Sequence, residues 1–289
     1  MFSKDEMIKE ILSNPYTASF VRKNNIQNDY LRNHLSSFID CLDSLKICEN
    51  CKGLDACKQA KKGEYVTLNC DGTIYNEVTY CKLYLEKKRK EKRLSYFVRC
   101  DIPEAYENLT LDKVEPVDDN ISNLMLECYD ILDEKRHKGL YIYGDLGVGK
   151  TYMCMALANS LANKQKKVAF VKVNFFVNEM RKLISINNEE YDKTLKSLKT
   201  VDYLILDDIG SESVSAYSRD DLLFNILDYR MEYKLTTIFT SNLSKDALLK
   251  HYTYDVKDNS SIIRAKRLYE RVDILSDDFV LEGKNKRRT

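Results

Sequence analysis

The spacing of apolar positions differs between the two halves of the chain, and this difference predicts two domains. In residues 4–45 apolar side chains recur at helical steps of three and four, for example at Leu31 and Leu35, so we expect helices there. In the second half, short β-rich runs alternate with helical stretches, an order that predicts crossover connections and a mostly parallel sheet. We therefore expect a small helical domain over residues 1–95 and an α/β domain over residues 96–289.

The elements of the α/β domain can be placed along the sequence. The runs expected to form strands are 140–143, 168–173, 203–206, 236–240 and 279–281. The stretches expected to form helices are 121–135, 150–163, 174–186, 219–233 and 261–271. Between the halves lies KLYLEKKRKEKR (82–93), whose seven basic and two acidic side chains are typical of a solvated helix, with direct contact to DNA as the alternative.

Length, charge and composition narrow the class of protein. The chain of 289 residues is 31% charged and 44% apolar, which is typical of a globular protein. It has no apolar run of about 18 residues, and its start, MFSKDEMIKEIL, lacks the apolar stretch of a secretory signal. We therefore expect a cytoplasmic protein without a membrane partner.

The net charge of the chain bears on binding to nucleic acid. Its 46 basic and 45 acidic residues give a net charge of +1, so binding to nucleic acid requires a local basic surface. Lys193, Lys196 and Lys199 are candidates for it.

Five of the nine cysteines lie within the 34 residues from 48 to 81. In a reducing compartment this clustering favours a metal site over disulfides. The pair Cys48-x-x-Cys51 can hold a metal ion, Cys57 and Cys81 can complete a tetrahedral site, and Cys70 is a spare ligand. Four thiolates leave no open position, so the predicted zinc ion is structural. Unliganded thiols are the alternative.

The most specific motif is a glycine-rich loop between an expected strand and an expected helix. It reads G-x-x-x-x-G-K-T and comprises Gly144, Asp145, Leu146, Gly147, Val148, Gly149, Lys150 and Thr151. The glycines let backbone N–H groups face a phosphate chain at the positive end of the helix. Lys150 is expected to reach the β- and γ-phosphates, and the Thr151 hydroxyl to bind magnesium. The motif therefore predicts a nucleotide-binding site.

Two carboxylates and an amide follow later strands. Asp207 and Asp208 end the apolar run YLIL; we expect Asp207 to hold the magnesium ion and Asp208 to orient or deprotonate the attacking water. A helix N-cap is the alternative. Asn242 follows the strand 236–240 and can help to place the water, although a plain turn would look the same. Glu212 is placed similarly, after the same strand, but the sequence does not assign it a role. An ordinary surface residue is the alternative.

A late helix carries basic residues at helical spacing. Arg264, Arg267 and Arg271 are three and four residues apart and share one face. One of them could enter a neighbouring subunit's site and neutralise charge on the transferred phosphate; a solvated basic face is the alternative. Arg230 is a weaker candidate for a similar contact between subunits.

With these motifs the chain resembles the DnaI-type primosomal helicase loaders, in the DnaC/DnaI branch of the AAA+ ATPases. The segments that carry the resemblance are KGLYIYGDLGVGKTYMCMALANSLA (138–162), YLILDDIGSE (203–212), YRMEYKLTTIFTSN (229–242), IIRAKRLYERVDIL (262–275) and the FVLEGKNKRR ending. The first half of the chain also agrees with this family in its order of parts: a helical region, then a zinc module with the cysteines, then a basic connector. A histidine that the family can carry is replaced here by Glu64 or Tyr65, which leaves Cys70 or Cys81 to complete the zinc site.

The resemblance implies an AAA+ domain with sheet order 5-1-4-3-2. It further implies that the N-terminal domain binds the replicative hexameric helicase, while the ATPase domain binds ATP and single-stranded DNA and self-associates. Residue by residue, Asp207 and Asp208 take the Walker B roles, Asn242 is sensor 1, and Arg267 or Arg271 is the arginine finger. The family pattern does not separate these two arginines, and Arg271 is preferred here.

Three other functions share parts of this pattern. An IstB-type transposition helper has the ATPase core but no zinc module. A small-molecule kinase would share the phosphate loop without needing the acidic strand, Asn242 and the late arginines together. A non-hydrolysing adaptor is less compatible with an intact Asp208. We therefore expect an ATPase that loads the replicative helicase onto single-stranded DNA during replication initiation or restart, with the transposition helper as the alternative.

Overall fold

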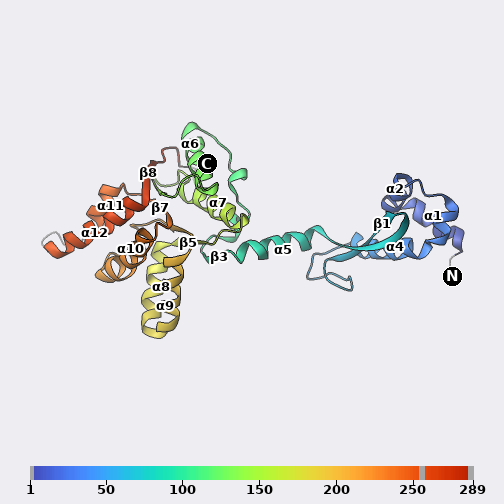
Figure 1. Ribbon diagram of the computed structural model, residues 1–289, viewed down its shortest axis with the longest axis horizontal. Helices are drawn as coiled ribbons and strands as arrows, with labels where there is room; N and C mark the ends of the chain where they lie inside the picture. Colours follow the sequence, from blue (N-terminus) through green and yellow to red (C-terminus); the bar gives the residue numbers. More distant parts are fainter. Residues whose placement is uncertain (1–2, 254–257, 286–289) are drawn as a thin grey trace. The chain divides into compact units, whose positions relative to one another are not determined.

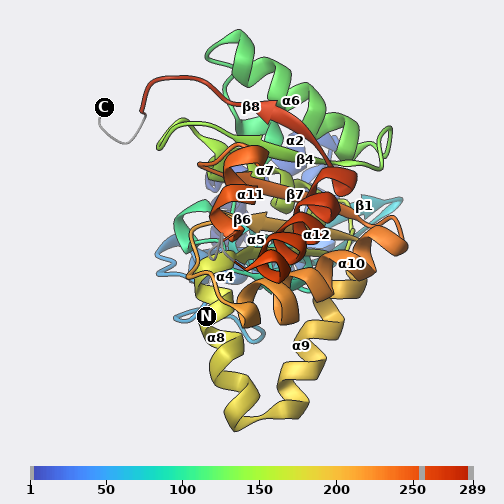
Figure 2. The same ribbon diagram turned by 90° about the vertical axis from the view of Figure 1, so that its left-hand side faces the viewer.

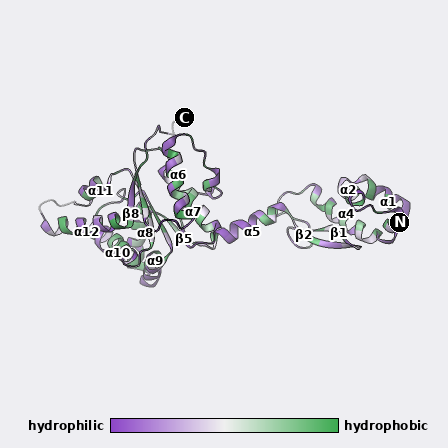
Figure 3. Cartoon of the chain, turned by 45° about the horizontal axis from the view of Figure 1, so that its top comes forward, coloured by the Kyte–Doolittle hydropathy of each residue, from purple (hydrophilic) through white to green (hydrophobic). Residues whose placement is uncertain are grey.

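The computed structural model describes residues 3–253 and 258–285, and its chain divides into two units, residues 1–92 and 93–289. We expected the division three residues later, after residue 95. The observed division falls inside α5 (Lys82–Leu94), the basic segment expected to be helical, which is coloured mostly hydrophilic in Figure 3. Each unit has its own hydrophobic core, so each is described by itself. The described ranges contain no helix with the length and apolar character needed to cross a bilayer.

The helices of the N-terminal unit are α1 (Lys4–Ser13), α2 (Pro15–Lys23), α3 (Asn28–Asn33) and α4 (Leu35–Glu49). They pack around Ile11, Leu31 and Phe38, whose side chains have no exposed surface. A hairpin that the sequence reading did not predict adds β1 (Glu64–Asp71) and β2 (Thr73–Tyr80), paired antiparallel. Its Leu68 and Ile74 complete the helical core. The hairpin was missed because its outer face carries apolar residues, which obscures the alternation of a half-buried strand.

The second unit is built on a parallel sheet of six strands (Figure 1). The strands are β3 (Phe97–Cys100), β4 (Gly139–Tyr143), β5 (Val168–Lys172), β6 (Tyr203–Asp207), β7 (Thr236–Ser241) and β8 (Ser276–Val280). Their spatial order is β8-β4-β7-β6-β5-β3. If β4 to β8 are numbered one to five along the chain, this is the predicted order 5-1-4-3-2, which is therefore confirmed. β3 is an additional edge strand, too short to give a clear pattern in the sequence.

Helices cover both faces of this sheet because strand side chains alternate between its two sides. The longer helices are α6 (Asp119–Leu132), α7 (Lys150–Asn163), α8 (Val173–Ile186), α9 (Asn188–Thr200), α10 (Phe224–Glu232), α11 (Lys245–Tyr252) and α12 (Asn259–Leu275). Ile205 of β6 belongs to the core with α6 and α7, whereas its neighbours Leu204 and Leu206 belong to the core with α8 to α12. Short turns η1 (Glu104–Tyr106) and η2 (Leu111–Lys113) precede α6, and a π-helical turn, η3 (Tyr217–Leu223), precedes α10.

One further difference from the expected elements has a simple cause. β8 begins at Ser276 rather than at residue 279, because it is an edge strand whose Asp277 and Asp278 are exposed, so a run of polar residues hid its start. α8 and α9 lie side by side (Figure 2), and α9 forms the helical insertion expected to carry the three lysines.

Candidate active site

The glycine-rich loop joins the end of β4 to the start of α7, where the sequence predicted it. Gly147 and Gly149 have φ angles of 83° and 115°, in the left-handed region that favours glycine. Gly144 is required for a different reason, since a Cβ atom at this position would lie 2.1 Å from the carbonyl oxygen of Leu281. The loop therefore has the curled backbone that a phosphate-binding loop needs.

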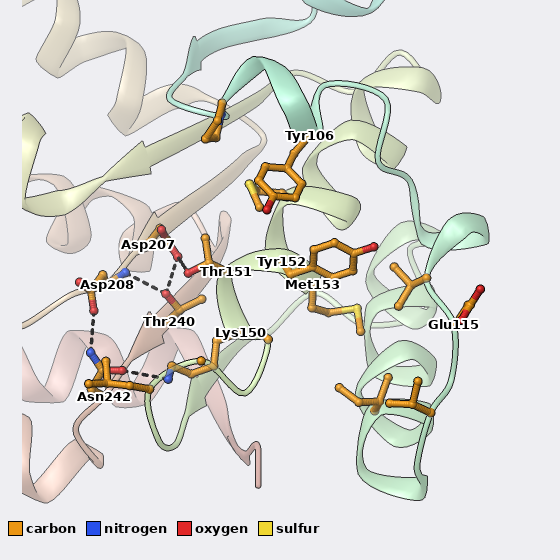
Figure 4. Close-up of a pocket in the computed structure, with 18 of the residues that line it drawn as sticks. Tyr106, Glu115, Lys150, Thr151, Tyr152, Met153, Asp207, Asp208, Thr240 and Asn242 are labelled. Carbon is orange, nitrogen blue, oxygen red and sulfur yellow. Dashed lines mark hydrogen bonds between the residues drawn. The ribbon is translucent and has the colours of Figure 1, made fainter. Parts of the chain in front are cut away.

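Lys150, the first residue of α7, extends its side chain back across this loop. Its Nζ donates hydrogen bonds to the carbonyl oxygens of Gly144 and Asp145, both at 2.7 Å. It also donates to Oδ1 of Asn242 at 2.9 Å (Figure 4). The residue is 8% exposed. The cation is therefore held over the phosphate loop and joined to the end of β7.

The carboxylate of Asp207, at the end of β6, lies between two hydroxyl groups. Its Oδ1 accepts hydrogen bonds from Thr151 Oγ1 at 2.8 Å and from Thr240 Oγ1 at 2.7 Å. Burial raises the pKa of Asp207, and the hydrogen bonds from Thr240 and Thr151 partly oppose this rise. The Thr151 hydroxyl and the Asp207 carboxylate offer the hard oxygen ligands that magnesium prefers, so the residues present fit the ion. Thr240 was not singled out in the sequence, because a threonine in a buried strand gives no functional signal.

Asp208 and Asn242 contact each other next to the Asp207 carboxylate. Asn242 Nδ2 donates to Asp208 Oδ1 at 3.1 Å, and the Asp208 backbone N–H donates to Thr240 Oγ1 at 2.8 Å. Asp208 has a φ angle of 61°, a left-handed conformation that aspartate tolerates better than most residues. Asn242 thus bridges Lys150 and Asp208, and its predicted role in placing the water stays a prediction.

A pocket of about 700 Å³ opens beside these groups (Figure 4). One end is lined by Lys150, Thr151 and Asp207, and the other by residues that the sequence reading did not anticipate. These are Pro103, Tyr106, Val114, Glu115, Val117 and Ile121. Ile121 lies in the first turn of α6, and the other five belong to the segment between β3 and α6, which lacks long regular elements and so carries no periodic signal.

The late arginines lie on α12, and none of them is among the described residues that line the pocket. Arg271 is paired with Asp228 at 2.9 Å and with Glu270 at 2.6 Å. Arg267 is exposed and stacks over the Phe224 ring, 4.4 Å from its centroid, and the described part of the chain offers it no ion pair. Arg264 lies 3.4 Å from a carboxylate oxygen of Asp220.

The burial of two charged residues excludes roles that the sequence left open for them. Arg230 cannot contact another subunit through its side chain, because the residue has no exposed surface. Its guanidinium donates to the carbonyl oxygens of Leu198, Lys199, Val201, Asp202 and Thr236 and to Thr237 Oγ1. Burial lowers the pKa of Arg230 to about 9. Glu212 is not a surface residue either, since it is 2% exposed.

The cysteines do not form the predicted zinc site in this arrangement. Within the described ranges no group of three or more histidine, cysteine or acidic side chains is placed to hold a metal ion. Cys48 Sγ accepts a hydrogen bond from Gln59 at 3.3 Å, and Cys57 Sγ accepts one from the backbone of Gly63 at 3.5 Å. Residues 50–63, all of them described, form neither helix nor strand, so no regular element brings these thiols together. Cys70 packs against the helical core.

The fold and this site define a P-loop ATPase of the AAA+ class. Residues 118–268 match the family model of the IstB-like ATP binding protein. The chain is 30% identical to the replicative helicase loader DnaI of Bacillus subtilis (strain 168), over 98% of this chain and 93% of that protein. The crystal structure of DnaI matches with a TM-score of 0.57 and 31% identity, over 68% of this chain and 100% of that chain. The protein therefore belongs to the DnaI family of replicative helicase loaders.

Proposed function

We propose that this protein uses ATP to load the replicative DNA helicase onto single-stranded DNA during replication initiation or restart. The observation that carries the proposal is the extent of the match to DnaI, which covers 98% of the chain and so includes the N-terminal unit as well as the ATPase unit. The IstB-type alternative is weaker, because that family model matches residues 118–268 only and leaves the N-terminal unit without a role.

ATP is held and hydrolysed by groups at the ends of β4, β6 and β7. The phosphate loop and Lys150 bind the phosphate chain, and the segment between β3 and α6 encloses the base. Thr151 and Asp207 would hold magnesium, which would offset the negative charge of the phosphates. Asp208 orients the attacking water or accepts its proton. Asn242, which contacts both Lys150 and Asp208, lies where it can help to place that water.

The remaining charge on the transferred phosphate is neutralised by an arginine from a neighbouring copy of the chain. Of the two candidates, Arg267 fits better, because it is exposed and its guanidinium contacts an aromatic ring rather than a carboxylate. Arg271 is held by Asp228 and Glu270 within its own chain. The role requires self-association of the ATPase unit on ATP binding.

The two units divide the remaining work. The N-terminal unit binds the hexameric helicase, and the ATPase unit binds single-stranded DNA. Lys193 and Lys196 are exposed on α9 and Lys199 is half-buried. The exposed Glu189, Glu190 and Asp192 lie before them, so the candidate for the local basic surface that a chain of net charge +1 requires is the C-terminal part of this helix.

A structural zinc ion in the N-terminal unit is a separate proposal, which rests on the spacing of Cys48, Cys51, Cys57 and Cys81. Two contacts are compatible with it: Cys57 Sγ and the Cys81 backbone N–H both hydrogen-bond to Gly63. Thiolate binding and local folding are coupled in such modules, so a change of arrangement in residues 50–63 would accompany metal binding.

The experiment that tests the loader function is a pull-down of the host's replicative helicase by the full chain, with and without ATP. We expect specific capture of the helicase. Capture of transposase instead of helicase would favour the IstB-type alternative.

A further inference from the structure

A buried carboxylate follows the acidic end of β6. Glu212 lies four residues after Asp208 and is 2% exposed. Its Oε2 accepts a hydrogen bond from the Gly210 backbone N–H at 2.9 Å, and its Oε1 accepts one from the hydroxyl of Tyr252. A carboxylate is costly to bury unless such donors satisfy it. Both oxygens have a donor here, so the side chain is fixed in one orientation.

The turn that Glu212 contacts is the one that sets the position of Asp208. Asp208 and Gly210 both have left-handed φ angles, 61° and 89°. The Ser211 backbone N–H and hydroxyl both donate to the Asp208 carbonyl oxygen, at 3.2 and 2.7 Å. On the side of β7, the Ile209 backbone N–H donates to the Thr240 carbonyl oxygen at 2.9 Å. The turn is thus anchored to β7 on one side and to Glu212 on the other.

Tyr252 makes this second anchor rigid. It is the last residue of α11 and is 1% exposed. Its carbonyl oxygen accepts a hydrogen bond from Arg219 Nη1 at 3.0 Å, and the same Nη1 donates to the Ser261 carbonyl oxygen at 3.2 Å. Arg219 is itself 1% exposed. The hydroxyl that holds Glu212 therefore belongs to a buried network that joins α11, η3 and α12.

We infer that Glu212 and Tyr252 are positioning residues for ATP hydrolysis, which hold the turn after β6 so that the Asp208 carboxylate faces the attacking water. The inference rests on the proposed ATPase function. A left-handed aspartate has accessible alternatives, and a small displacement of a catalytic group lowers the rate steeply. The position of Asp208 consequently depends on the hydrogen bond between Gly210 and Glu212.

Glu212 does not itself act on the water. It is not among the described residues that line the pocket, whereas Asp208 is. Its two oxygens accept hydrogen bonds from Gly210 and Tyr252, which directs the carboxylate towards α11. Glu212 therefore affects ATP turnover by holding the Asp208 carboxylate in position.

The test compares three single variants of the full chain by ATP turnover, nucleotide affinity and thermal unfolding. Glu212→Gln keeps the size of the side chain but replaces one acceptor oxygen by a donor. Tyr252→Phe removes only the hydroxyl. Tyr203→Phe is the matched control, because its hydroxyl also contacts a carboxylate, that of Glu134 at 3.4 Å, at the opposite end of β6. We expect kcat to fall roughly 10- to 100-fold in the first two, with nucleotide affinity unchanged, and no such fall in the control.

A second measurement separates positioning from loss of stability. In the Asp208→Asn background, single-turnover assays should show little further effect of Tyr252→Phe, because the group being positioned is already lost. Unchanged kcat in both single variants would overturn the inference, as would an equal loss in Tyr203→Phe or a fully additive loss with Asp208→Asn. A parent protein that does not hydrolyse ATP would instead count against the proposed ATPase function.

Discussion

The ATP site and the cysteine segment differ in how far the chain itself organises them. At the ATP site, polar side chains from α7, β6 and β7 hydrogen-bond to one another, and Lys150, Asp207 and Thr240 are buried. In residues 50–63, which form neither helix nor strand, the thiols of Cys51 and Cys57 contact nearby backbone groups, and Cys48 at the end of α4 contacts the amide side chain of Gln59. A site at the ends of parallel strands can be preorganised before its ligand arrives, whereas a thiolate site in a loop depends on its metal for folding.

The proposed arginine finger is the one group of the ATP site that would come from a neighbouring copy of the chain, and its removal gives the largest expected effect. Arg267→Ala should lower ATP turnover by roughly 10³-fold or more, the loss typical of an arginine finger, with nucleotide affinity nearly unchanged. Steady-state ATPase assays and calorimetry measure the two quantities.

Arg271→Ala is the matched control for this variant, because both arginines contact the Phe224 ring. Its removal should lower stability through loss of the contact with Asp228, with a smaller effect on turnover. The opposite ranking would assign the finger to Arg271, and equal small effects would mean that α12 supplies no catalytic arginine.

Within the chain, the next largest effect concerns Asp208. Asp208→Asn keeps the left-handed backbone accessible, since asparagine also tolerates it, and it keeps a hydrogen-bonding partner for Asn242. We expect turnover to fall roughly 10²-fold or more while ATP remains bound. An ATPase assay in parallel with a nucleotide-binding measurement tests this, and unchanged turnover would exclude Asp208 as the water-orienting group.

The smallest expected effect on turnover comes from removing zinc. If the cysteine segment binds the ion, chelation should unfold part of the N-terminal unit and abolish helicase capture, yet leave ATP turnover nearly unchanged, because the ATPase unit has its own cores. Elemental analysis of protein purified without chelator measures the ion. Cys57→Ser should lose it and Cys70→Ser should retain it, since Cys70 packs against the helical core. Absence of zinc from the parent would end this proposal.

The sequence predicted the parts of the molecule whose geometry is local. The phosphate loop was predictable because its glycines and Lys150 have fixed spacing between a strand and a helix, and the sheet order followed from the family resemblance. The roles of Arg230 and Glu212 were not predictable, because charged residues are expected at the surface and only tertiary packing shows that these two are buried. The partners of Glu212 lie up to 40 residues away, beyond any local pattern.

The most direct test of the central claim is the loading of the host's replicative helicase onto circular single-stranded DNA by the full chain and by Lys150→Ala. Lys150→Ala removes the cation that spans the phosphate loop and should abolish tight ATP binding. We predict that the parent loads the helicase only with ATP, and that Lys150→Ala still captures the helicase through the N-terminal unit but fails to load it. Equal loading by the variant, or no ATP-dependent loading by the parent, would contradict the account.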